Sequence, residues 1–193
     1  MIINLIFLEY PFCIFDRYYN YMEITLNKNS IDLGVKLGTF LFIITAIIYV
    51  VDINYFSNFL LMLAVYRIPV ISFGVYAVIS NKKLKNGIIT FKEAFTSYFL
   101  CIVVGYLIIN LGSIVLFKFI DPTAAGIINE NAMVAVKEMM ENYNTPSELI
   151  AATMDEMQNN DAFSFSSIIT EFFNRLLLNA IFAVPVSLIF KKS

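Results

Sequence analysis

The segment that decides the fold is residues 94–120, AFTSYFLCIVVGYLIINLGSIVLFKFI, in which Lys118 is the one charged residue. A helix needs about 20 predominantly apolar residues to cross the hydrocarbon core of a bilayer. Within lipid, an isolated segment can satisfy its own backbone hydrogen bonds only as a helix. We therefore predict that residues 94–120 form a membrane-spanning helix.

Three further segments share this length and apolar character: 31–51, 56–80 and 165–190. Of the 193 residues, 59% are apolar and 15% are charged, whereas a soluble domain usually carries about 25% charged residues. One aqueous core could not hide this much apolar surface. The sequence therefore predicts an all-α integral membrane protein, a four-helix bundle that forms a single domain and contacts the lipid bilayer.

The connections between the predicted spans differ in charge. Residues 81–92 hold four lysines, and the chain ends in Lys191 and Lys192. Residues 121–161 hold eight acidic residues and one lysine. Because basic residues beside membrane helices stay in the cytoplasm, we expect both chain ends and the 81–92 connection inside, and the acidic segment 121–161 outside.

The first 30 residues precede the first predicted span. Residues 1–21 are apolar but interrupted by charges and a proline, and their apolar run 2–8 is too short to span. They lack the basic leading region and small-residue cleavage site of a signal peptide. We therefore hypothesise that Met22 is the true start of the protein, and an intact mass that includes residues 1–21 would reject this hypothesis.

Capping signals divide the acidic segment into two helices. Asp121 followed by Pro122 fits an N-cap with proline in the first turn, and Thr145 to Glu148 has the spacing of a capping box. We predict helices over 122–142 and 146–159. Each has an apolar face at helical spacing, so we expect an extramembrane helical hairpin whose faces meet each other or rest on the membrane.

The order of these features resembles a known family. The run Asn86-Gly-Ile-Ile-Thr-Phe-Lys-Glu-Ala-Phe95 introduces the third span, which ends in Phe-Ile-Asp-Pro122, and a hairpin rich in Met and Glu and a final span follow. Over about 31–192 this layout resembles the bacterial membrane proteins grouped as family 4199 of domains of unknown function, DUF4199. The resemblance implies a four-helix protein of the bacterial inner membrane. It implies no activity, cofactor or catalytic residue.

Arg67 is the charged residue that lies deepest in a predicted span. Counted from residue 56, it is about 11 residues, or roughly 16 Å, along the helix. A charge at such depth costs at least ~2.5 kcal/mol, so the side chain should face protein or water. Pro69 frees the carbonyl of Val65, which adds another polar group in need of a partner.

Other polar residues should reach the depth of Arg67 in the outer half of the bundle. We expect a candidate intramembrane polar cluster of four side chains: Arg67, Asn110, Glu171 and Arg175. Glu171 and Arg175 have the i, i+4 spacing of an ion pair, and Glu171 could also reach Arg67 across helices. The positive excess could hold an anion. The alternative is that these residues only join helices, or that Arg67 extends to the outer surface.

Two other patterns have ordinary structural explanations. Gly34 and Gly38 form a GxxxG spacing, which could mark a dimer face or, as we favour, close packing inside one bundle. Met154 and Met157 have a spacing like that of copper ligands, but no His or Cys accompanies them. The acidic residues lack the alternating pattern of a calcium loop. We predict no metal and no cofactor.

No enzyme signature is present. The sequence lacks HExxH, a nucleophile elbow, a P-loop and GxGxxG, and it has no histidine, the commonest general base. A net charge of −2 argues against nucleic acid as a partner. We expect a non-enzymatic structural, accessory or regulatory membrane subunit that assembles with itself or with another membrane protein. The alternative is a small oligomeric transporter or channel that uses the polar cluster around Arg67.

Overall fold

The computed structural model describes residues 3–159 and 164–192. Its helices follow one another in this order: α1 (Ile3–Val51), the short 3₁₀ helix η1 (Ile53–Ser57), α2 (Phe59–Leu84), α3 (Phe91–Ile114), the π-helical turn η2 (Val115–Ile120), α4 (Pro122–Asn142), α5 (Ser147–Asn159) and α6 (Phe165–Phe190). No strand occurs in the described part of the chain. The predicted all-α class is confirmed.

In the described part of the chain, four helical segments are long and apolar enough to cross a membrane: Met22–Val51, Leu60–Leu84, Phe91–Ile120 and Phe165–Phe190. They correspond in number and order to the four predicted spans, so the four-helix membrane bundle is confirmed. The helix that carries the first span begins earlier than expected, because α1 runs without a break from Ile3. The hypothesis that translation starts at Met22 stays a prediction.

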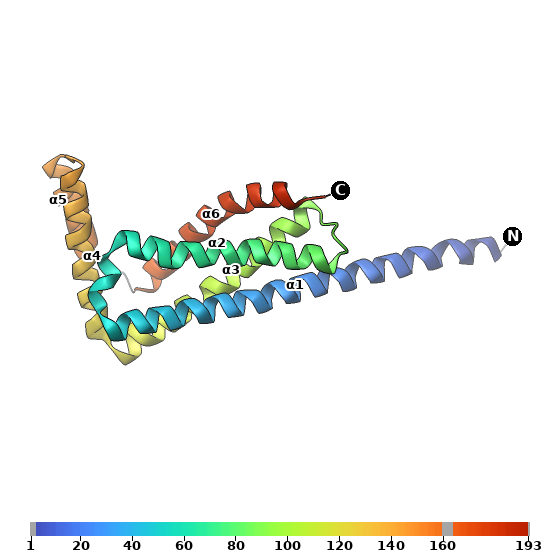
Figure 1. The fold of residues 1–193 in the computed structure, drawn as a ribbon, viewed down its shortest axis with the longest axis horizontal. Coiled ribbons are helices and arrows are strands. Elements are labelled where there is room, and N and C mark those ends of the chain that lie inside the picture. Colours follow the sequence, from blue (N-terminus) through green and yellow to red (C-terminus); the bar gives the residue numbers. More distant parts are fainter. Residues whose placement is uncertain (1–2, 160–163, 193) are drawn as a thin grey trace.

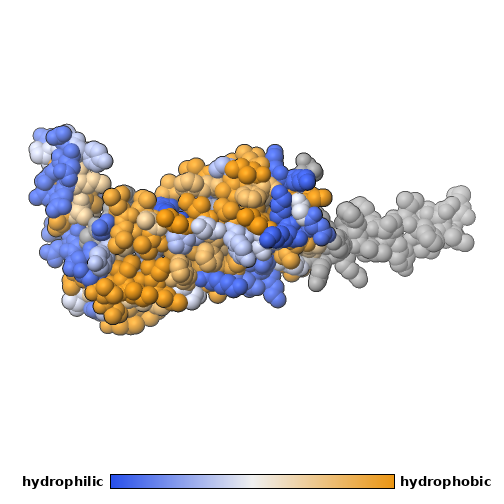
Figure 2. Space-filling model, viewed as in Figure 1, coloured by the Kyte–Doolittle hydropathy of each residue, from blue (hydrophilic) through white to orange (hydrophobic). Residues whose placement is uncertain are grey.

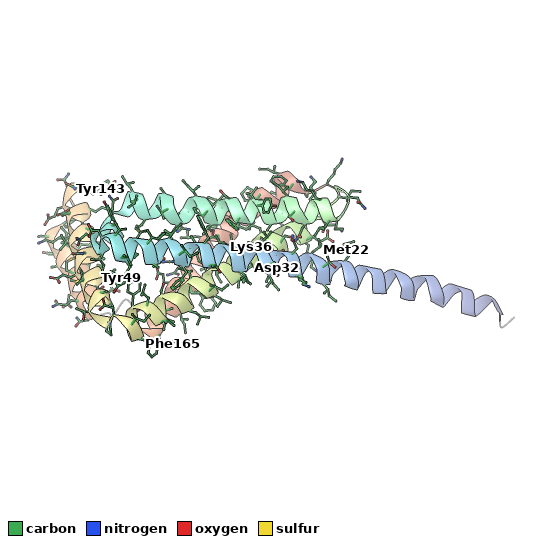
Figure 3. All side chains as sticks on the ribbon, turned by 60° about the horizontal axis from the view of Figure 1, so that its bottom comes forward. Met22, Asp32, Lys36, Tyr49, Tyr143 and Phe165 are labelled. Atoms are coloured by element: carbon green, nitrogen blue, oxygen red, sulfur yellow. The ribbon has the colours of Figure 1, made fainter. Side chains whose placement is uncertain are left out.

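The four long helices lie together, and α4 and α5 stand across one end of them (Figure 1). We call this end the hairpin end. The opposite end, which we call the lysine end, holds the turn between α2 and α3 and the C-terminal residues, and α1 extends beyond the bundle there. Figure 3 shows Tyr49, Tyr143 and Phe165 at the hairpin end and Met22 near the lysine end.

The surface has the banded pattern of a membrane protein. In Figure 2 apolar residues dominate the middle of the bundle, while the hairpin and the lysine end are largely hydrophilic. Large apolar side chains remain exposed on every long helix, for example Ile47 at 56%, Leu107 at 46% and Ile181 at 67%. Water would disfavour such a surface, whereas lipid is an equally apolar solvent for it.

Helices α1 and α3 pack closely through the two glycines of the GxxxG motif. A Cβ atom built on Gly34 would lie 2.6 Å from the carbonyl oxygen of Cys101, and one on Gly38 would lie 2.6 Å from the Cβ of Ile108. No larger side chain fits at such distances. The favoured interpretation, close packing inside one bundle, is therefore confirmed, and the motif is not free to form a dimer face.

The helices are joined at the lysine end by buried polar contacts. Asn81 is fully buried, and its Nδ2 lies 2.9 Å from Ser30 Oγ of α1 and 2.7 Å from Ser97 Oγ of α3. Lys82 Nζ donates to the carbonyl oxygen of Phe190, at 2.9 Å, and so joins α2 to the last turn of α6. These contacts hold all four long helices together at this end.

A capping box formed by Thr90 and Glu93 begins α3. Glu93 N–H donates to Thr90 Oγ1 at 3.3 Å, and Thr90 N–H donates to a carboxylate oxygen of Glu93 at 2.9 Å. Lys85 Nζ donates to the other oxygen of the same carboxylate, at 2.7 Å. The turn before it reverses the chain at Asn86 and Gly87, which have φ of 54° and 89°. Both angles lie in the left-handed region that Gly and Asn tolerate best.

Asp121 begins α4, as predicted, and fastens it to the bundle. Its carboxylate accepts from Tyr49 Oη of α1 at 2.8 Å and from Ala124 N–H at 3.1 Å. The hydrogen bond from Tyr49 and those from the helix backbone hold the pKa of Asp121 below its ordinary value of 3.8. A second tie, 2.9 Å long, joins Asn131 Nδ2 of α4 to Asn54 Oδ1 of η1.

The hairpin of α4 and α5 is confirmed, but its turn differs from the expectation. The predicted capping box between Thr145 and Glu148 is not found among the hydrogen bonds of the described residues. Instead Thr145 N–H donates to the carbonyl of Met140 at 3.0 Å and closes the end of α4, with Asn144 in the left-handed region. Helix α5 then begins at Ser147, and its first carbonyl acceptor is Pro146.

Candidate functional site

A cavity of about 660 Å³ lies between α2, α3 and α6 in the half of the bundle nearest the hairpin. Helix α4 contributes Ile128, Asn129 and Ala132 to its lining and so lies across its hairpin side. The polar side chains of the lining come from five helices: Thr45, Tyr66, Arg67, Tyr106, Asn110, Ser113, Asn129, Glu171, Asn174 and Arg175. The rest of the lining is apolar.

All four residues of the predicted polar cluster line this one cavity: Arg67, Asn110, Glu171 and Arg175. Their depths overlap because each lies a similar number of turns from the hairpin end of its helix. Arg67 is eight residues into α2, or about 12 Å at 1.5 Å per residue. This is less than the 16 Å expected from the sequence, because α2 begins at Phe59 and not at residue 56.

Glu171 and Arg175 form the predicted i, i+4 ion pair. Arg175 Nε donates to Glu171 Oε1 at 3.0 Å, and Nη2 donates to the same oxygen. Their side chains are 58% and 34% exposed, so the pair lies at the mouth of the cavity and not on its floor. The guanidinium carbon of Arg175 also lies 5.9 Å from the ring centre of Tyr106. The charge of Arg175 is thus balanced within α6.

The charge of Arg67 is not balanced in this way. Among the described residues it makes no ion pair and no hydrogen bond, so the expected contact with Glu171 across helices is not formed. Glu171 is the only carboxylate that the described residues contribute to the lining, and it is bound to Arg175. The described part of the lining therefore carries one net positive charge, and Arg67 supplies it.

The sequence did not single out several polar residues of the lining, among them Thr45, Tyr66, Tyr106 and Asn129. Tyr66 Oη and Thr45 Oγ1 lie 2.7 Å apart and join α2 to α1, and Tyr106 Oη accepts from Asn179 Nδ2 at 3.1 Å. Tyr106 lies one helical turn from Asn110, a spacing that places both on one face and could have indicated it. Thr45 and Asn129 come from elements whose contact with the cavity depends on tertiary packing.

The cavity is closed toward the lysine end. One turn below Arg67, Val70 is fully buried, and Ile102 and Tyr98 are fully buried below Tyr106. The ring of Tyr98 lies directly over Gly74, where a Cβ would approach it to 2.5 Å.

No cluster of three or more His, Cys, Asp or Glu that could hold a metal ion occurs among the side chains that the structure describes. The arrangement as a whole is that of a polytopic helical membrane protein with a polar cavity open on one side. The chain belongs to the family described as "Protein of unknown function (DUF4199)", which matches residues 32–192. This confirms the resemblance seen in the sequence. No curated protein and no solved structure matches the chain.

Proposed function

We propose that this protein is a non-enzymatic accessory or regulatory protein of the bacterial inner membrane, and that it binds a small molecule in the cavity below its hairpin. The observation that carries the proposal is the cavity itself. Its volume of about 660 Å³ falls among known ligand sites, which range over roughly 300–1,000 Å³. Such sites combine mostly apolar walls with a few convergent polar groups, as this one does.

The chemistry of the lining supports binding more than catalysis. General acid–base and nucleophilic catalysis need a reactive group paired with a base within hydrogen-bond distance. Among the described residues of the lining, the one carboxylate is held by Arg175, and the hydroxyl of Thr45 is bonded to Tyr66 and to the carbonyl of Leu41. The lining thus offers charge and hydrogen bonds to a ligand without an activated nucleophile.

The distribution of charge supports an orientation with the cavity on the outer side. Lys82, Lys83 and Lys85 lie at the lysine end, and Lys192 N–H bonds to the carbonyl of Ile89 beside them. The hairpin at the other end is acidic. By the positive-inside rule the lysine end faces the cytoplasm, so the hairpin and the cavity face outward.

Native mass spectrometry tests ligand binding on protein purified from its own membranes. We expect a bound small molecule on the wild type and its loss in Ser113→Phe, because the added ring occupies the cavity. The matched control is Ser72→Phe, which places the same ring on the exposed face of α2. A bound molecule that survives Ser113→Phe, or a wild type that is always empty, contradicts the proposal.

The alternative of an oligomeric transporter uses the same cavity. A site open toward one side and closed toward the other is also the resting form of a transporter. The buried side chains at Val70, Tyr98 and Ile102 argue against an open channel through one copy. Net flux of the bound molecule across proteoliposomes distinguishes transport from binding alone.

A further inference from the structure

We propose that the ligand of this cavity is an amphipathic anion. Its phosphate or carboxylate group binds Arg67, and its apolar chain extends sideways between α2 and α6 into the membrane. This inference rests on the proposed binding function and adds the chemical class of the ligand and its route of entry. Three observations carry it: the unpaired charge of Arg67, the apolar side chains at the edge of the cavity, and the residues of α4 that cover the cavity on its hairpin side.

The unpaired charge selects an anionic group. Arg67 has no partner among the described residues, while Arg175 is neutralised by Glu171. An arginine held unpaired within a membrane span is costly, and a bound anion removes that cost. The guanidinium presents a rigid fork of donors that matches a phosphate or carboxylate in two parallel hydrogen bonds. Asn110 on α3 adds an amide to the same lining.

The apolar side chains at the edge of the cavity favour a ligand with a hydrocarbon chain. Leu63 of α2 and Leu178 of α6 both line the cavity, yet they are 47% and 45% exposed on the surface of the bundle. Each side chain therefore reaches from the cavity to the surface that faces lipid. A chain lying between these two leucines would replace contacts with lipid by similar apolar contacts.

The long helices also pack least closely on this side of the cavity, between α2 and α6. Helices α2 and α6 touch each other less than any other adjacent pair of long helices, and Lys82 ties them together at the lysine end. Toward water, Ile128, Asn129 and Ala132 of α4 cover the cavity. The route that remains is lateral, from the outer leaflet. The anionic group could belong to a phospholipid of the bilayer or to a separate single-chain amphiphile.

The test uses the full-length protein in nanodiscs of phosphatidylcholine and follows its thermal unfolding. Three probes are compared. Dodecyl phosphate carries both an apolar chain and an anion, dodecanol carries the chain alone, and inorganic phosphate is the anion alone. A ligand that binds only the folded protein raises Tm, and at a given concentration a tighter ligand raises it more. We expect dodecyl phosphate to raise Tm at a concentration at least about tenfold below dodecanol, and inorganic phosphate to have no effect.

Variants assign the anion to Arg67. We expect Arg67→Gln to weaken the response to dodecyl phosphate about tenfold or more, and Arg67→Lys to restore part of it. Lys36→Gln is the matched control, because it removes one positive charge from an exposed position of α1. Nanodiscs that contain phosphatidylglycerol identify the source. If they raise the Tm of the wild type but not of Arg67→Gln, the ligand is a bilayer lipid.

The outcomes separate this inference from the proposed function. If Ser113→Phe abolishes the responses but Arg67→Gln does not, the cavity binds a ligand and the ligand is not an anion held by Arg67. If dodecanol or inorganic phosphate acts as well as dodecyl phosphate, the ligand is not an amphipathic anion. If Ser113→Phe leaves every response unchanged, the probes bind outside the cavity and the binding function itself fails.

Discussion

At the scale of single residues, Asn81 and Arg67 are two polar side chains in membrane spans that differ in how fully they are hydrogen-bonded. Asn81 is fully buried, and its amide nitrogen lies within 3.1 Å of the carbonyl of Leu26 as well as of the two serine hydroxyls. Its amide oxygen accepts from Asn29 Nδ2 at 2.7 Å. Every polar atom of this side chain is satisfied, whereas the guanidinium of Arg67 makes no hydrogen bond and no ion pair among the described residues.

Removing the Asn81 side chain should therefore destabilise the bundle. We expect Asn81→Ala to lower the free energy of unfolding by about 1–2 kcal/mol, because interhelical hydrogen bonds in membranes contribute about 0.6 and at most about 1.7 kcal/mol each. Titration of mixed micelles with a denaturing detergent measures this. Asn27→Ala is the control, since Asn27 is half-buried and outside this network, and it should change stability by less than about 0.5 kcal/mol. Equal losses in the two variants would show that the network is not stabilising.

The two residues also mark what could be predicted from the sequence at this scale. The depth of Arg67, Asn110, Glu171 and Arg175 follows from counting residues along a helix, so their meeting in one lining could be expected. Whether Arg67 finds Glu171 depends on the rotation of α2 and α6 about their axes, which no local pattern determines. Asn81 was assigned to a connection, because its burial becomes visible only once α2 extends to Leu84.

At the scale of helices, the closest pair is α1 and α3. Gly34, Gly38 and Gly105 remove side chains from this interface, and Leu37 lies 2.8 Å from where a Cβ of Gly105 would be. Small residues allow two backbones to approach, and van der Waals contact then drives association in lipid. The GxxxG spacing could be recognised in the sequence. The helix that packs against it could not, because a second copy of the chain and α3 offer the same kind of surface.

Substitutions of single glycines test this interface. Gly38→Ala should destabilise the protein by about 1–3 kcal/mol, because its Cβ would meet the backbone oxygen of Gly105 at 2.7 Å as well as Ile108. Gly126→Ala makes the same change in α4, where nothing lies within 4 Å, and should stabilise that helix by up to about 1 kcal/mol. Detergent-induced unfolding of the two variants measures the sign of each change in stability. A Gly38→Ala protein that unfolds like wild type but loses self-association would restore the dimer interpretation.

At the scale of the whole molecule, a band of apolar surface lies between an acidic hairpin and a lysine-rich end (Figure 2). Span number, hairpin and helix order could all be predicted, because each follows from local length, composition and capping. The cavity could not, since its lining combines residues of α4 with residues of α1, α2, α3 and α6. Those are properties of packing between distant segments.

We propose that the chain crosses the membrane four times, with the hairpin and the cavity on the outer side. Labelling of single cysteines in intact cells with a membrane-impermeant maleimide tests it most directly, after replacement of Cys13 and Cys101. Tyr143→Cys places the thiol on the hairpin, where Tyr143 is 80% exposed, and Lys83→Cys places it at the lysine end. We predict that the Tyr143→Cys protein is labelled in intact cells and the Lys83→Cys protein only after the membrane is opened. The reverse pattern, or equal labelling of both before the membrane is opened, would contradict it.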